Sequence, residues 1–204
     1  TGGEPLLDNH LVECLDSIAF DSQIKINMFS GLGLSMSRFM RILDKLESLS
    51  NKYKNFSMKI SAENIGKFYE FNRYGNSWSD FLEKVVLLKQ RGIKFNFHSV
   101  ISNLTLFGYS DFFERFTDTR ITIDFVHQPH MLSPHVLDDQ SKNMLRKQLK
   151  NLNDKNVVLL LKSIDPEPTE LERLNLKEFL LEFTRRRLDL SLDIFPKSFL
   201  QWIQ

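Results

Sequence analysis

Apolar residues recur along this chain at two alternating periods, the helical period of about 3.6 residues and the strand period of about two. Helical stripes are predicted at residues 11–18, 39–46, 78–88, 107–116, 140–152 and 171–188. Strand patterns are predicted at residues 23–29, 56–61, 93–101, 121–126 and 157–164. The helix over 78–88 has both end signals, because Ser77 or Ser79 can cap its start and Arg91-Gly92 can end it. Helices and strands therefore alternate.

This alternation predicts an α/β fold. Strands that return every ~30 residues with helices between them favour a parallel sheet with right-handed crossovers. An open doubly wound sheet and part of a (β/α) barrel both satisfy the pattern, so the two architectures stay open. Both bind ligands at the carboxyl ends of their strands. Those ends are expected at residues 2–4, 29–31, 61–63, 99–103 and 126–130.

The composition fits a globular domain and argues against several partners. With 204 residues, of which 42% are apolar and 26% charged, the chain can bury a sizeable core. Its 27 Lys and Arg balance 26 Asp and Glu, which argues against a nucleic-acid partner because a polyanion selects a basic face. No apolar run approaches the ~20 residues of a membrane span, and no segment has the pattern of a signal peptide. We expect a cytoplasmic protein without a membrane partner.

A single cysteine, Cys14, excludes a disulfide framework. Apolar neighbours at helical spacing predict that Cys14 is a buried structural thiol. The chain begins with Thr1 and runs directly into a Gly-Gly pair, an unusual start for a domain. We therefore expect a truncation at this end. The basic run Arg185-Arg186-Arg187 lies close to Glu182, and we interpret it as a solvated, partly paired helix face.

Two segments carry a resemblance to a known family. The run Thr1-Gly2-Gly3-Glu4-Pro5-Leu6-Leu7, followed by a helix, resembles the end of the second strand of the radical S-adenosylmethionine (radical SAM) barrel. Ile60-Ser61-Ala62-Glu63, with Phe71-Asn72-Arg73-Tyr74-Gly75 and Trp78, resembles the fourth strand and following segment of the group with SPASM or twitch domains. The tail with Phe195-Pro196 also resembles that group.

The resemblance implies a partial (β/α) TIM-like barrel, comprising about strands two to six of a radical SAM core. Residues 1–137 would form this partial barrel, and residues 138–204 its C-terminal edge and a helical extension. S-adenosylmethionine would be the cofactor. Peptide or protein modification is the favoured reaction class of the group, with the substrate itself left open.

A carboxylate after two glycines suits an amine or a ribose, because glycines let the backbone approach a ligand closely. Alone, this motif is weak, and a plain turn explains it better. The resemblance implies that Gly2, Gly3 and Glu4 hold the amino group of S-adenosylmethionine. Polar residues at later strand ends would then lie near its ribose or carboxylate, namely Ser61, Glu63 and Ser99.

Three further residues have two readings each. Arg73 either pairs with a carboxylate of cofactor or substrate, which a guanidinium binds bidentately, or is a surface arginine. Asn103 either contacts cofactor or substrate or caps a helix before Leu104. His127 either lies on a lip over the adenine or substrate or is a solvated histidine of a turn. Together with His130 and His135 it would also offer a zinc complement, which no acidic ligand supports.

The chain lacks the CxxxCxxC triad, whose three thiolates hold a [4Fe-4S] cluster in this family. In the intact parent, the cluster would cleave S-adenosylmethionine to a 5′-deoxyadenosyl radical that abstracts a substrate hydrogen. We assign no catalytic residue to this chain and expect it to be inactive alone. Two alternatives remain: a degenerate, non-catalytic module that binds S-adenosylmethionine, and an unrelated α/β metal hydrolase that uses the histidine loop.

Overall fold

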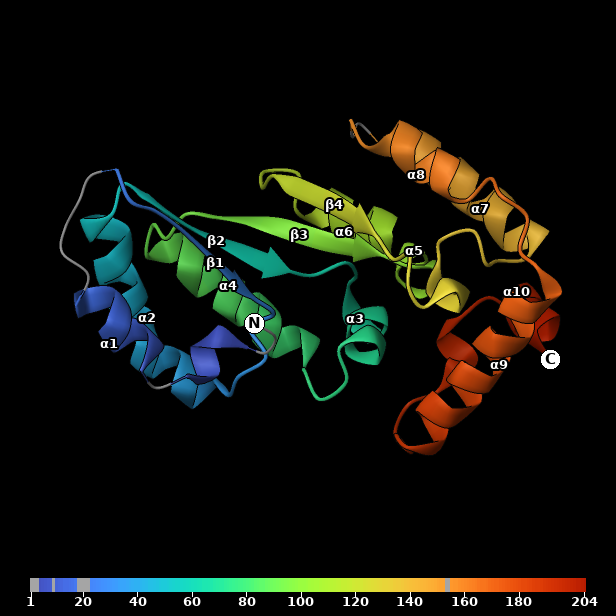
Figure 1. The fold of residues 1–204 in the computed structure, drawn as a ribbon, viewed down its shortest axis with the longest axis horizontal. Coiled ribbons are helices and arrows are strands. Elements are labelled where there is room, and N and C mark those ends of the chain that lie inside the picture. The colour runs from blue at the N-terminus through green and yellow to red at the C-terminus, as the bar shows by residue number, and fades with distance from the viewer. Residues whose placement is uncertain (1–3, 9, 18–22, 153–154) are drawn as a thin grey trace. The chain divides into compact units, whose positions relative to one another are not determined.

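A computed structural model describes residues 4–8, 10–17, 23–152 and 155–204 (Figure 1). The chain divides into two compact units, each assembled from three segments. Unit 1 contains Thr1–Ala62, Arg73–His98 and Asp118–Thr122, and unit 2 contains Glu63–Asn72, Ser99–Thr117 and Ile123–Gln204. The predicted boundary at residue 137 rests on the resemblance and stays a prediction.

The sheet consists of parallel strands in the order in which they occur in the chain, β1-β2-β3-β4. These strands are β1 (Lys25–Ser30), β2 (Asn55–Ser61), β3 (Phe95–Ile101) and β4 (Ile121–Phe125). The register pairs Met28 with Met58 and Ile60 with Phe97. The predicted α/β fold with a parallel sheet is therefore confirmed.

In unit 1, the helices α1 (Leu11–Ser17), α2 (Met36–Lys52) and α4 (Trp78–Gln90) accompany the strands (Figure 1). The apolar stripe of α2, which includes Phe39, Leu43 and Leu46, is fully buried, as are Phe56, Met58 and Ile60 of β2. Ser77 caps α4, as one of the two predicted alternatives. Arg91 is the C-cap of this helix, and Gly92 follows with a φ of 64° that glycine adopts without strain.

The opposite face of the sheet in unit 1 carries mostly polar side chains. We call it the open face and define it by the alternate strand positions Lys25, Asn27, Phe29, Asn55, Ser57, Lys59, Ser61, Asn96, His98 and Thr122. These residues are exposed or half-buried, whereas residues on the other side of the strands are buried, namely Met28, Phe56, Met58, Ile60 and Phe97.

Unit 2 is mainly helical. Its helices are α3 (Gly66–Asn72), α5 (Asn103–Leu106), α6 (Tyr109–Arg115), α7 (Asp139–Lys150), α8 (Val157–Ser163), α9 (Glu170–Arg185) and α10 (Lys197–Ile203). Aromatic rings form much of its core: Phe107 lies 5.5 Å from Phe195 and 5.2 Å from Phe199 between ring centroids. None of the described helices is both long and apolar enough to cross a bilayer.

Two sequence predictions are wrong. Residues 157–164 form the helix α8 and not a strand, because the apolar run Val157–Leu161 suits either element and here buries Leu160 in a helix beside α7. Cys14 is exposed and not buried. On α1, Leu11 and Leu15 are half-buried, whereas Cys14 next to Leu15 is exposed, so the helical spacing of its apolar neighbours does not bury the thiol.

Candidate cofactor-binding site

The Glu4 carboxylate is fixed at the carboxyl end of β1. Ser30 donates its hydroxyl to Glu4 Oε1 at 2.6 Å, and the amide of Gly31 donates to Oε2 at 2.9 Å. Oε1 also accepts from the amide of Leu6 at 3.2 Å, which makes Glu4 the N-cap of the short 3-10 helix η1 (Pro5–Leu7). Gly2 and Gly3 lie outside the described residues.

The Arg73 guanidinium and the Glu4 carboxylate both lie close to Gly31. A methyl group at Gly31 would lie 3.1 Å from Arg73 Nη1 and 3.7 Å from Glu4 Oε2. A side chain at position 31 would therefore displace the guanidinium, so glycine is needed for this close approach. Two of the predicted site residues, Glu4 and Arg73, are thus brought together in unit 1.

The loop after β1 has a strained backbone. Leu32 is nearly fully buried and has a φ of 54°, a left-handed conformation that a residue with a side chain rarely adopts. Its amide donates to the Ser30 hydroxyl at 3.0 Å, and its carbonyl accepts from the amide of Leu34 at 2.9 Å. The strained residue, Leu32, is therefore hydrogen-bonded to the Ser30 hydroxyl, which in turn donates to Glu4.

A buried lysine of α4 donates two hydrogen bonds to this loop. Lys84 is only 4% exposed, and its ammonium donates to the carbonyls of Leu32 at 3.0 Å and Leu34 at 2.5 Å. Burial lowers the pKa of Lys84 below its ordinary value, and the carboxylates of Asp80, Glu4 and Glu83 oppose this shift. Lys84, Leu32, Ser30 and Glu4 thus form one chain of hydrogen bonds.

Ser61 lies at the same edge of the sheet in unit 1. The register pairs Ser30 with Ile60, so Ser61 follows at the carboxyl end of β2. Its side chain is half-buried. In a parallel sheet these neighbouring ends face the same side, which is where ligands bind.

The other predicted residues belong to unit 2, where most of them support the fold. Glu63 is buried, and its Oε1 accepts from the amide of Val100 at 3.4 Å. Ser99 is fully buried on β3. Neither side chain offers the exposed polar surface expected of a ribose contact.

Asn103 links two parts of unit 2 by hydrogen bonds that the sequence did not predict. Its amide group donates to the carbonyls of Met131 at 2.9 Å and Val136 at 3.0 Å, which ties α5 to the loop over 129–136. The cap of α5 is instead Ser102, which forms a capping box with Thr105. The expectation that Asn103 is the cap is therefore wrong.

The three histidines of the loop after β4 have different surroundings. His127 is exposed, and His130 bonds Gln128 at 2.7 Å. His135 bonds Glu172 of α9 at 3.3 Å. Within the described ranges, no group of three His, Cys, Asp or Glu side chains is placed to hold a metal ion.

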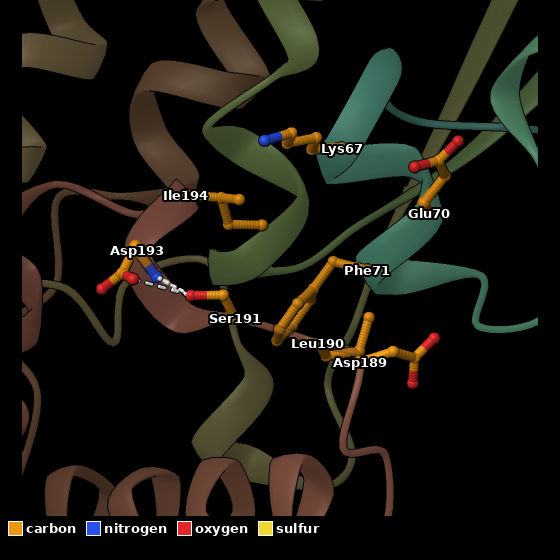
Figure 2. Close-up of a pocket in the computed structure, with 8 residues that line it drawn as sticks. All are labelled: Lys67, Glu70, Phe71, Asp189, Leu190, Ser191, Asp193 and Ile194. Atoms are coloured by element: carbon orange, nitrogen blue, oxygen red, sulfur yellow. Dashed lines mark hydrogen bonds between the residues drawn. The ribbon is translucent and has the colours of Figure 1, made fainter.

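Figure 2 shows a pocket of about 500 Å³ within unit 2. Its walls come from α3 and from the segment before α10; they are Lys67, Glu70, Phe71, Asp189, Leu190, Ser191, Asp193 and Ile194. The Ser191 hydroxyl bonds the Asp193 carboxylate at 2.9 Å, so these polar groups pair with each other. None of the predicted cofactor residues lines this pocket.

Two important residues were not named as site residues from the sequence. Ser30 nevertheless lies within the ligand position predicted at residues 29–31, at the carboxyl end of a predicted strand. Lys84 carries no such signal, since a lysine between Glu83 and Val85 on a helix normally reads as exposed.

Comparisons of the chain with protein-family models, with curated proteins and with solved structures found no match.

Proposed function

We propose that this chain is the S-adenosylmethionine-binding part of a radical SAM enzyme of the SPASM/twitch group. The order of the strands supports the architecture that the resemblance implies. When every right-handed crossover joins neighbouring strands in sequence, all helices fall on one face, as in a (β/α) barrel. A doubly wound sheet reverses its strand order and covers both faces. The buried face against α2 and the polar open face of unit 1 agree with the barrel.

The position of Glu4 and Arg73 over Gly31 carries the proposal. An amino-acid head group has an ammonium, which a carboxylate accepts, and a carboxylate, which a guanidinium binds bidentately. S-adenosylmethionine ends in such a head group. The described donors use three of the roughly four acceptor positions of the Glu4 carboxylate, which leaves room for an ammonium.

The residues of this chain do not fit the iron-sulfur cluster of the family. Three thiolates are required, whereas the chain has one cysteine, which is exposed on α1. The role proposed for this chain is therefore to bind and orient S-adenosylmethionine. A non-catalytic module would share this role, and the presence of a cysteine triad elsewhere in the same polypeptide distinguishes the two.

Calorimetric titration of the chain with two ligands tests the proposal. S-adenosylmethionine has the amino-acid head group, whereas 5′-methylthioadenosine has the same nucleoside without it. We expect Glu4→Gln to weaken binding of the first ligand about 10- to 100-fold, the usual cost of losing a charged hydrogen-bond partner, and to leave the second unchanged.

The matched control is Glu47→Gln, which removes a carboxylate of α2 that pairs with Arg91 on the surface of unit 1. It should bind both ligands as the unmodified chain does. Failure of the unmodified chain to bind S-adenosylmethionine contradicts the proposal. Equal weakening of both ligands by Glu4→Gln would reduce Glu4 to a structural residue.

A further inference from the structure

Arg38 on α2 binds the segment that carries Glu4. Its Nε donates to the carbonyl of Leu6 at 3.3 Å, and its Nη2 donates to the carbonyl of Leu7. Both carbonyls belong to η1, whose N-cap is Glu4. One guanidinium therefore ties η1 to α2 through two residues that lie 32 and 31 positions away in the chain.

Arg38 lies where its own helix gains nothing from a cation. The Ser35 hydroxyl caps α2 and accepts from the Arg38 amide at 3.4 Å, so Arg38 belongs to the first helical turn. That end of a helix has a positive partial charge, and a cation there is unfavourable. The guanidinium instead binds carbonyls at the end of η1, where a cation is favourable. The position of Arg38 is therefore explained by η1 and not by the stability of α2.

The Glu4 carboxylate joins two segments, each of which is bound by a cation on a helix. On one side it accepts from the amide of Leu6 in η1, the segment that Arg38 binds. On the other side it accepts from the Ser30 hydroxyl in the loop after β1, which Lys84 binds. Displacement of either segment would therefore move the carboxylate relative to the other.

We propose that Arg38 is a positioning residue of the ligand site: it keeps η1 on α2 and thereby holds the Glu4 carboxylate where the ammonium of the ligand binds. This inference rests on the role proposed above for Glu4. Arg38 binds two backbone carbonyls, and we assign it no contact with the ligand. Its effect on affinity should therefore depend on Glu4.

Calorimetric titration of Arg38→Met tests this dependence. The substitution removes the guanidinium and keeps a side chain that suits a helix. It should weaken S-adenosylmethionine about tenfold, the order of loss seen when a group that orients a ligand-binding residue is removed. Binding of 5′-methylthioadenosine, which lacks the head group, should not change. The matched control is Arg41→Met, which changes an exposed arginine of the same helix and should bind both ligands as the unmodified chain does.

A double-mutant cycle separates positioning from a general effect on the fold. Once Glu4→Gln has removed the carboxylate, Arg38 has no charge to position, so adding Arg38→Met should weaken S-adenosylmethionine by less than about twofold. An equal loss with and without the Glu4 carboxylate would overturn the inference, because Arg38 would then act independently of Glu4. Equal weakening of both ligands by Arg38→Met would overturn it as well.

A measurement without ligand keeps this inference distinct from the proposed function. The Gly31 amide donates to Glu4 Oε2, so its hydrogen exchange reports whether the carboxylate stays in place. Exchange of this amide should be faster in Arg38→Met, as in Glu4→Gln, while that of Leu46 in the middle of α2 should not change. Unchanged exchange of Gly31 in Arg38→Met would overturn the inference whether or not S-adenosylmethionine binds. Faster exchange in a chain that does not bind S-adenosylmethionine would contradict only the proposed function and support the positioning of Glu4 by Arg38.

Discussion

Lys84 shows how one buried charge can set the shape of a ligand loop. Removing an ammonium from water is costly unless hydrogen bonds replace its hydration. Lys84 receives this compensation from the carbonyls of Leu32, the residue with the left-handed backbone, and of Leu34. The cost of the charge and the cost of the strained loop are therefore offset by a single set of bonds.

The lowered pKa of Lys84 predicts a dependence of stability on alkaline pH. In the window between this lowered pKa and the ordinary value of 10.5, the unfolded chain binds more protons than the folded one. The free energy of unfolding should therefore rise with pH in this window. Lys84→Met should lose this rise, measured as the difference between the two proteins in urea denaturation from neutral to alkaline pH. Lys45→Met, on the exposed side of α2, should retain it; a Lys84→Met curve parallel to that of the unmodified chain would contradict the prediction.

Gly31→Ala should affect ligand binding more than stability. The added methyl group would lie 3.1 Å from Arg73 Nη1, the mobile end of a long side chain that can move aside. We expect the free energy of unfolding to change by no more than about 1 kcal/mol. Affinity for S-adenosylmethionine should fall while that for 5′-methylthioadenosine stays constant, by calorimetry. A large loss of stability with intact binding would show that the guanidinium has no part in the site.

At the scale of elements, the spacing of apolar residues was sufficient to predict helix or strand wherever an element has one buried face. The stripe of α2 and the alternation of β2 were both predicted from sequence and both occur, because each pattern matches only one kind of backbone. The run Val157–Leu161 has no polar positions to reveal its period, and its helix follows from burial of Leu160 beside α7. The carboxyl end of β1 was predicted as a ligand position, but the bonds from Lys84 depend on tertiary packing that no local pattern records.

The start of α9 offers a test at this scale. Thr169 and Glu172 form a capping box, and Glu172 also bonds His135. Thr169→Ala should cost about 1 kcal/mol of unfolding free energy, since it leaves a helix amide without its acceptor. Thr184→Ala, in the same helix, removes a hydroxyl that only bonds back to the carbonyls of Leu180 and Leu181 in its own helix, and should be nearly neutral. Equal effects of the two variants in urea denaturation would contradict the role of the cap.

At the scale of the whole molecule, the division into units does not follow the order of the chain. Both β3 and β4 contribute residues to each unit, so neither unit is a continuous stretch that could be separated by one cut. The predicted site residues are divided in the same way: Glu4, Ser61 and Arg73 belong to unit 1, and Glu63, Ser99, Asn103 and His127 to unit 2. Sequence alone predicted where β1, β2, β3 and β4 end to within one residue. It did not predict this division, which depends on which side chains pack together.

Shared strands predict that the two units unfold together. Unfolding of either unit would break part of the β3 and β4 ladders and leave the remaining strand residues without their partners, so a half-folded chain is disfavoured. The two tryptophans report on the units separately, because Trp78 stacks on Phe81 in unit 1 and Trp202 packs near Phe199 in unit 2. In Trp78→Phe and Trp202→Phe variants, the remaining fluorescence should show urea transitions that coincide with each other and with circular dichroism. Adding Phe199→Ala, which removes a fully buried ring of unit 2 at a cost of about 3–5 kcal/mol, should shift the Trp78 signal as far as the Trp202 signal. A shift confined to Trp202 would mean that the units unfold independently despite their common strands.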